Sequence, residues 1–173
     1  MKTYKLEDIF GFAVEVEEQG QRFYEAASAD AKTDEEKDLF AYLSKAEMKH
    51  AKRFLKFQAS YARKGGAFTA DAHFSALLDT LMRGMIFPDR AKLREAIGQR
   101  DRNPLLSLIR IAMEVEANSV MFYQEMSSLL AEAEAKEALA KIVKEEQGHL
   151  VKLKQRRLEL DPYYAALKYG SWF

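Results

Sequence analysis

The chain carries the pattern Glu-x-x-His twice, as Glu47–His50 and as Glu146–His149, and 99 residues separate the two copies. These patterns use two of the three histidines in the chain. Residues three apart in a helix lie on one face, so each pattern can direct a carboxylate and an imidazole to one point. The chemistry that such a pair favours is the binding of a metal ion through oxygen and nitrogen.

A second segment repeats at the same offset of 99 residues: 12–24 reads FAVEVEEQGQRFY and 111–123 reads IAMEVEANSVMFY. Each copy holds a Glu, followed seven residues later by a Tyr, and each Glu lies thirty residues before the Glu of a Glu-x-x-His pattern. Four carboxylates and two imidazoles are the donor set of a dinuclear metal site in a four-helix bundle. The predicted ligands are Glu17, Glu47, His50, Glu116, Glu146 and His149.

The rest of the chain predicts the helices that must position these groups. It has only three prolines and eight glycines, and apolar residues recur at three- and four-residue spacing nearly throughout, which indicates an almost entirely helical protein. Thr33 with Glu36 fits a capping box, Asn103-Pro104 fits a helix start, and Asp161-Pro162 fits a helix end. The predicted helices span 7–30, 33–64, 103–130 and 134–160, with shorter helical patterns at 70–83 and 89–97.

This order predicts a single domain over residues 1–173, an all-α fold made of two helical hairpins. Hairpin 1 spans about 7–64 and hairpin 2 about 103–160, and a long crossover at 65–102 joins them. That connectivity is typical of a ferritin-like four-helix bundle. The aromatic tail at 161–173 is predicted to pack on the bundle or on a second subunit.

The spacing of the candidate ligands supports the hairpins independently. The midpoint between Glu17 and Glu47 is residue 32, in the first predicted turn, and the midpoint between Glu116 and Glu146 is residue 131, beside the second. In an antiparallel hairpin, residues equidistant from the turn face each other, here ~15 residues or ~22 Å from it. Joining the hairpins with pseudo-twofold symmetry would bring all six groups together.

Oxygen and imidazole donors without sulfur suit iron and manganese, although zinc or copper can occupy such a site. Two divalent cations would cancel the charge of four carboxylates, which are costly to bury alone. In this interpretation Glu47 and Glu146 bridge the metals, Glu17 and Glu116 each bind one end, and each histidine supplies one nitrogen. The alternative is that these residues are solvated charges on helix surfaces, as most glutamates are.

Further positions also match at the offset of 99 residues. The phenols of Tyr24 and Tyr123 are predicted to hydrogen-bond a ligating carboxylate, with core filling as the alternative. Gly20 and Ser119 lie one turn after Glu17 and Glu116. Close helix approach and room for a small oxidant both explain them.

Other acidic and histidine residues fit a metal site less well. Glu15 and Glu114 also repeat, but they point about 200° away from the neighbouring ligands and are expected on the surface or at an interface. Glu145 has Ala46 as its counterpart, so it is left out of the site. His73 has no partner pattern, and a structural or solvated role is expected.

Composition excludes several function classes. The chain has no cysteine, which rules out thiolate metal sites, iron–sulfur clusters and thiol catalysis. Lysine plus arginine equals aspartate plus glutamate at 27 each, so no overall charge favours nucleic acid or a membrane surface. Without a signal peptide pattern or a long apolar stretch, the expected location is cytoplasmic.

These duplicated motifs resemble the rubrerythrin branch of the ferritin-like superfamily, in its erythrin form without a rubredoxin domain, over nearly the whole chain. The resemblance implies a di-iron centre (manganese or zinc possible) that reduces hydrogen peroxide, or oxygen, in oxidative-stress defence. Because the cysteines of a rubredoxin are absent, the reducing equivalents must come from a separate electron-donor protein. A homodimer is expected. The ligands that the resemblance implies are Glu17, Glu47, His50, Glu116, Glu146 and His149.

One departure from rubrerythrins concerns the third predicted helix. Rubrerythrins tend to carry an additional carboxylate one turn from the ligand on this helix, whereas Met113 and Ser119 flank Glu116 here.

The sequence leaves three hypotheses for the function. They are a di-iron peroxidase or oxidase, a protein that oxidises and holds iron without turnover, and a structural bundle that metal only stabilises.

Overall fold

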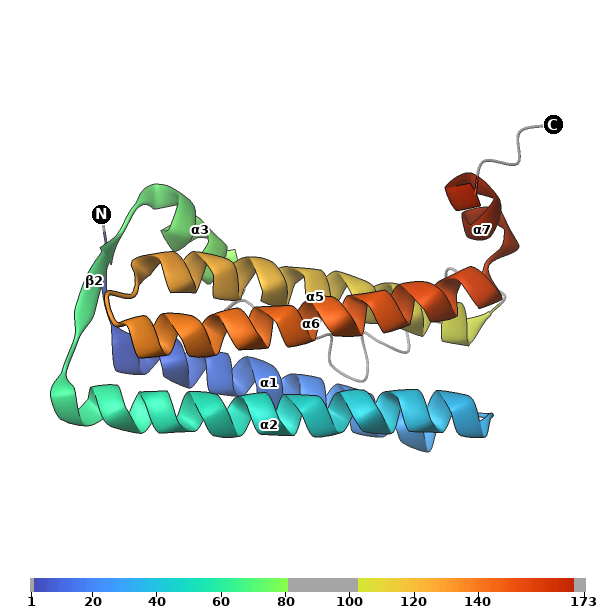
Figure 1. Cartoon of the computed structure of the whole chain (residues 1–173), viewed down its shortest axis with the longest axis horizontal. Coiled ribbons are helices and arrows are strands. Elements are labelled where there is room, and N and C mark those ends of the chain that lie inside the picture. Colours follow the sequence, from blue (N-terminus) through green and yellow to red (C-terminus); the bar gives the residue numbers. More distant parts are fainter. Residues whose placement is uncertain (1, 81–102, 170–173) are drawn as a thin grey trace. The chain divides into compact units, whose positions relative to one another are not determined.

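The structure, a computed structural model, describes residues 2–80 and 103–169. The chain divides into two compact units, residues 1–87 with 129–135 and residues 88–128 with 136–173. The first unit is built on the helical hairpin α1–α2, and the second on the hairpin α5–α6 (Figure 1). Each unit therefore holds one copy of the repeated motifs.

In the first unit, α1 (Leu6–Ala29) and α2 (Asp34–Lys64) run antiparallel, joined by a short turn. The hydroxyl of Thr33 accepts a hydrogen bond from the Glu36 amide at 3.2 Å, which caps α2 as predicted. The Glu36 carboxylate accepts from the amide of Lys32 at 3.0 Å. These two hydrogen bonds satisfy the backbone amides of Glu36 and Lys32, and together they fix the residue at which α2 begins.

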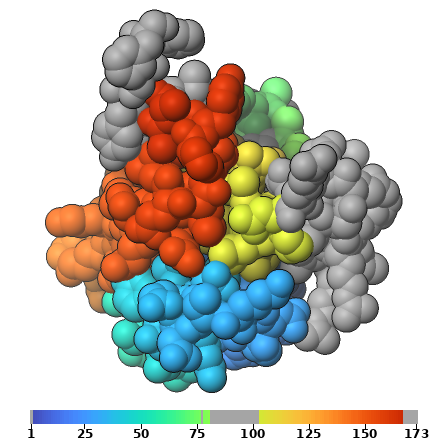
Figure 2. Space-filling view, turned by 90° about the vertical axis from the view of Figure 1, so that its right-hand side faces the viewer, coloured from blue at the N-terminus to red at the C-terminus, as the bar shows by residue number. Residues whose placement is uncertain are grey.

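The core of this hairpin is aromatic. Phe10 stacks on Tyr61 at 5.2 Å and on Phe57 at 5.3 Å between ring centroids. Figure 2 views the end where α1 passes into α2, and the blue and cyan atoms of the two helices are in direct contact there. The fully buried rings of the hairpin are those of Phe10, Tyr24, Phe40 and Phe54.

A small antiparallel sheet, which the sequence analysis did not predict, stands at the other end of this hairpin. Strand β1 (Lys2–Lys5) pairs with β2 (Ala67–Ala70), with Lys2 opposite Ala70. The rings of Tyr4 and Phe68 stack at 5.7 Å across the two strands. After β2 the chain forms α3 (Ala72–Thr80), which confirms the described part of the helix predicted at 70–83.

In the second unit, α5 (Pro104–Leu129) and α6 (Ala133–Leu160) form the other hairpin. Asn103 caps α5, because its side-chain oxygen accepts hydrogen bonds from the amides of the second and third residues of that helix at 3.1 and 3.3 Å. Both predicted helices are confirmed to within one or two residues.

The predicted stop at Asp161-Pro162 is also the start of another helix, α7 (Pro162–Tyr169). Asp161 caps α7 by accepting from the Tyr164 amide at 3.1 Å, and it pairs with Arg110 of α5 at 3.0 Å. The Tyr164 ring lies 3.8 Å from the Arg157 guanidinium of α6. Tyr164 of the aromatic tail thus packs on its own unit, whereas Tyr163 is exposed.

Three predictions remain outside these observations. The helix predicted at 89–97 lies outside the described residues, as does the end of the tail. Packing of the tail on a second subunit and a single domain over the whole chain stay predictions. Within the described ranges, none of the helices combines the length and the apolar character needed to cross a membrane.

Candidate metal centre

Glu17 of α1 converges with Glu47 and His50 of α2, and we call these three residues the hairpin 1 triad. The Nδ1 atom of His50 lies 3.5 Å from Oε2 of Glu17 and 3.8 Å from Oε2 of Glu47. One donor atom from each residue lies within 4.8 Å of the others. They meet because Glu17 and Glu47 are equally far from the α1–α2 turn, as the sequence predicts.

Glu116 of α5 converges in the same way with Glu146 and His149 of α6, and these three form the hairpin 2 triad. The Nδ1 atom of His149 lies 3.4 Å from Oε2 of Glu116 and 2.8 Å from Oε2 of Glu146. Both histidines therefore turn the same nitrogen toward a pair of carboxylates. The repeat in the sequence is thus a repeat in local geometry.

Burial separates the six predicted ligands from ordinary surface charges. Their exposed fractions lie between 0 and 3%. Among the described residues, the other buried acidic groups are Glu36 and Asp161, and both cap helices as described above. Glu15 and Glu114, two residues from a ligand, are exposed, and so is His73. The interpretation of the six as solvated surface charges is therefore wrong.

Burial and mutual repulsion shift the titration of the hairpin 2 triad in the metal-free protein. Burial, and then the charge of Glu146, raise the pKa of Glu116 to about 8. Burial lowers the pKa of His149, but hydrogen bonds to Glu116 and Glu146 and the charges of both outweigh that effect and raise it to about 9. The triad thus retains protons that the same groups would lose in water.

These shifts predict that the metal-free protein loses stability as the pH rises from about 5 to 9. Both folded pKa values lie above the ordinary ones, so the folded state binds more protons than the unfolded state in this range. Each pKa unit corresponds to about 1.4 kcal/mol, so the expected loss is a few kcal/mol. Urea denaturation in the presence of a chelator measures it. Glu116→Gln should flatten the dependence, and a gain in stability over this range would contradict the assignment.

The donor set fits iron or manganese. Each triad offers carboxylate oxygen and imidazole nitrogen without sulfur, and two ionised carboxylates match the charge of one divalent cation. A buried carboxylate pair beside an imidazole is unfavourable without a cation or protons, which gives each triad a physical reason to bind one. The union of both triads in one centre, and the bridging roles of Glu47 and Glu146, stay predictions.

The predicted tyrosines lie in the core, and aromatic packing accounts for part of their surroundings. Tyr24 and Tyr123 are fully buried. The Tyr24 ring lies 5.1 Å from that of Phe23 and 6.3 Å from that of Phe40, and the Tyr123 ring lies 5.3 Å from that of Phe122. The hydrogen bonds from these phenols to the ligands stay a prediction.

Comparison with known proteins agrees with the predicted resemblance. Residues 8–75 match the family model of rubrerythrin, a range that contains the whole hairpin 1 triad. No curated protein matches the chain. A crystal structure of a candidate ferritin-like diiron-carboxylate protein from Thermotoga maritima is similar at a TM-score of 0.69 and 27% sequence identity, covering 92% of this chain and 98% of that one. The predicted resemblance and the all-α, ferritin-like fold are thereby confirmed.

Proposed function

We propose, from the similarity to rubrerythrin, that the two triads together hold two iron ions and that the protein reduces hydrogen peroxide or oxygen in oxidative-stress defence. The observation that carries the proposal is the duplicated, buried set of two carboxylates and one imidazole in each hairpin. A structural bundle gains nothing from burying four carboxylates. A dinuclear centre needs all of them.

In this proposal each residue of the two triads has a defined role in metal binding. Glu17 and His50 would bind one metal, and Glu116 and His149 the other. Glu47 and Glu146 would bridge the two. Two iron ions held there would supply the two electrons that a peroxide reduction requires, one from each ion. Peroxide then needs two protons to leave as two molecules of water, and the reducing equivalents must return from outside, from a separate electron-donor protein.

The ligands lie on helices with a dry aromatic core. Tyr24, Phe40, Phe122 and Tyr123 are almost completely buried, and the six ligands themselves are at most 3% exposed. In a water-poor site the carboxylates interact more strongly with a cation. The phenols are two turns from Glu17 and Glu116 on the same faces, where they can donate to a carboxylate and hold it in place.

A second candidate function is oxidation and retention of iron without peroxidase turnover. One observation favours it: the positions one turn either side of Glu116 are Met113, which is half-buried, and Ser119, which is buried. Neither can act as the additional carboxylate that rubrerythrins tend to have. In this candidate function the same ligands bind iron, but one metal cannot change ligands between oxidation states.

We expect peroxide to oxidise the reduced, iron-loaded protein faster than oxygen does, because a pair of metals held by the two triads would supply Lewis-acid stabilisation to a two-oxygen substrate. Protein purified without oxygen would be analysed for metal, mixed with either oxidant in a stopped-flow instrument, and followed by ferric absorption. A clearly faster reaction with oxygen would move the assignment to the iron-oxidising candidate. Absence of bound metal would reject both.

We also propose that the protein is a cytoplasmic homodimer that binds neither nucleic acid nor membrane. The balanced charge of the chain supports the part of this proposal that concerns nucleic acid and membrane. Storage of many iron atoms requires a closed shell of many subunits, so a native mass measurement separates a small oligomer from a storage particle.

A further inference from the structure

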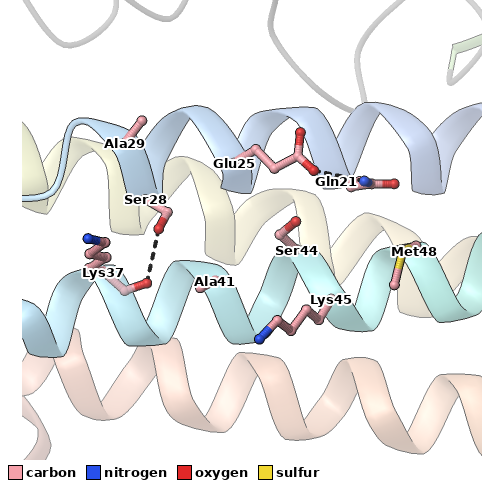
Figure 3. A pocket seen from close by; sticks show the side chains of 9 residues that line it. All are labelled: Gln21, Glu25, Ser28, Ala29, Lys37, Ala41, Ser44, Lys45 and Met48. Atoms are coloured by element: carbon pink, nitrogen blue, oxygen red, sulfur yellow. Dashed lines mark hydrogen bonds between the residues drawn. The ribbon is translucent and has the colours of Figure 1, made fainter.

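A groove of about 500 Å³ follows the seam between α1 and α2 within the first unit (Figure 3). At its turn end, the hydroxyl of Ser28 donates to the carbonyl of Lys37 at 3.1 Å. On its α1 side, the amide of Gln21 donates to the carboxylate of Glu25 at 2.8 Å. The residues that line it are Gln21, Glu25, Ser28, Ala29, Lys37, Ala41, Ser44, Lys45 and Met48.

Several residues that line the groove lie within one helix turn of ligands in the hairpin 1 triad. Gln21 lies one turn after Glu17 on α1, and Ser44 lies one turn before Glu47 on α2. Met48, which also lines the groove, directly follows Glu47. Ser44 is the most buried lining residue, with 7% of its surface exposed, and in Figure 3 it points from α2 toward α1. The groove therefore runs beside the helix turns that carry Glu17 and Glu47.

The helix turns beside the hairpin 1 ligands differ from the equivalent turns in the second unit. At the offset of 99 residues, Ser44 corresponds to Val143 and Gly20 corresponds to Ser119. The exposed fractions of Ser44 and Val143 are similar, at 7% and 9%. Hairpin 1 thus has the smaller residue at both positions, and it has a hydroxyl where hairpin 2 has a branched apolar side chain. The side chains at the equivalent positions 44 and 143 are therefore similarly buried, but they differ in size and in polarity.

We propose that this groove is the route by which a small uncharged oxidant reaches the hairpin 1 triad, and that Ser44 sets the size of the oxidant admitted. The inference rests on the proposed function and adds its specificity-determining residue. The lining carries Lys37 and Lys45 against the single carboxylate of Glu25, a net positive charge that disfavours a metal cation. Hydrogen peroxide is neutral, and the Ser44 hydroxyl can both donate to it and accept from it.

The test uses the absence of cysteine from the chain. A Ser44→Cys variant has a single thiol, which methyl methanethiosulfonate converts to a methyl disulfide and a reductant restores. We expect rapid labelling of the metal-free protein. In the iron-loaded protein, the label should slow oxidation by hydrogen peroxide about tenfold or more, as added methyl-sized groups do in tight sites, and removal of the label should restore the rate.

Val143→Cys is the matched control, because its position is equivalent and similarly buried. It should label more slowly, and its label should leave the oxidation rate unchanged. Ser44→Leu and Val143→Leu repeat the comparison without a reagent, and Ser44→Leu should discriminate more strongly against tert-butyl hydroperoxide than wild type does.

The possible results distinguish a failure of the proposed access route from a failure of the proposed function. Equal labelling of the two cysteines, or an unchanged peroxide rate after Ser44→Cys is labelled, would overturn the route while wild type still binds iron and reacts. Failure of wild type to bind iron or to react with peroxide would overturn the proposed function, and the labelling of the metal-free variants would still report the groove.

Discussion

Replacing Glu47 and Glu146 together by alanine should abolish the binding of both metal ions. Each is one of three donors in its triad, and a carboxylate that bridges two metals weakens both sites when it is removed. Loss of a group that only supports a ligand costs 10- to 100-fold in affinity, so losing two ligands should cost more than about 100-fold. Metal analysis after anaerobic purification, and titration of the chelated protein with ferrous iron, measure the loss.

The chain offers a matched control for this experiment. Glu15 and Glu114 repeat at the same offset, lie two residues from ligands and are exposed. Alanine at both positions should leave the metal content at two per chain. Two tightly bound metals in the Glu47→Ala, Glu146→Ala double variant would contradict the dinuclear assignment, provided circular dichroism shows that the helices persist.

Metal binding should stabilise the protein strongly, whereas removal of the four buried carboxylates should not destabilise the metal-free form. At a free metal concentration of 1,000 Kd the gain is about 4 kcal/mol, or roughly 10 °C in Tm for a chain of this size. Binding should also release protons, because the metal-free hairpin 2 triad retains some at neutral pH. Melting curves of the loaded and the chelated protein measure the stabilisation.

The companion variant changes Glu17, Glu47, Glu116 and Glu146 to glutamine. Without metal it should melt at or above the temperature of metal-free wild type, because the helices keep their apolar faces and lose only repulsion and the cost of burying charge. Glu15→Gln with Glu114→Gln is the control for surface charge. If metal-free wild type melts no lower than the loaded form and the quadruple variant unfolds, these glutamates act as structural ion-pair partners instead.

The helices and the two triads could be predicted from sequence because local signals determine them. Thr33 and Asn103 cap helices by contacts with residues two or three positions away. Equal distances from a turn bring each Glu opposite its Glu-x-x-His pattern, provided only that the hairpin is antiparallel. Spacing does not establish how two hairpins join, and the single centre therefore remains a prediction.

Other features depend on contacts or geometry that periodicity does not report. Strands β1 and β2 have four residues each, too few to show alternation, and Lys2 pairs with the distant Ala70. Asp161-Pro162 signals a helix stop and a helix start equally well, since aspartate caps and proline fits the first turn. The groove depends on how closely two helices approach. The one sign of the groove in the sequence is that the repeat has Ser44 in hairpin 1 and Val143 at the equivalent position of hairpin 2.

The division of the ligands between the two hairpins affects which measurements can reveal how many chains form one metal centre. Each unit supplies a complete triad from its own two helices, so the chemistry of the site does not depend on both hairpins coming from one chain. Two molecules that exchanged their second hairpins would present the same six donors at each centre. Metal content and ferric absorption would be identical per chain in the exchanged and unexchanged forms. Only a measurement of mass or of connectivity between labelled hairpins tells such assemblies apart.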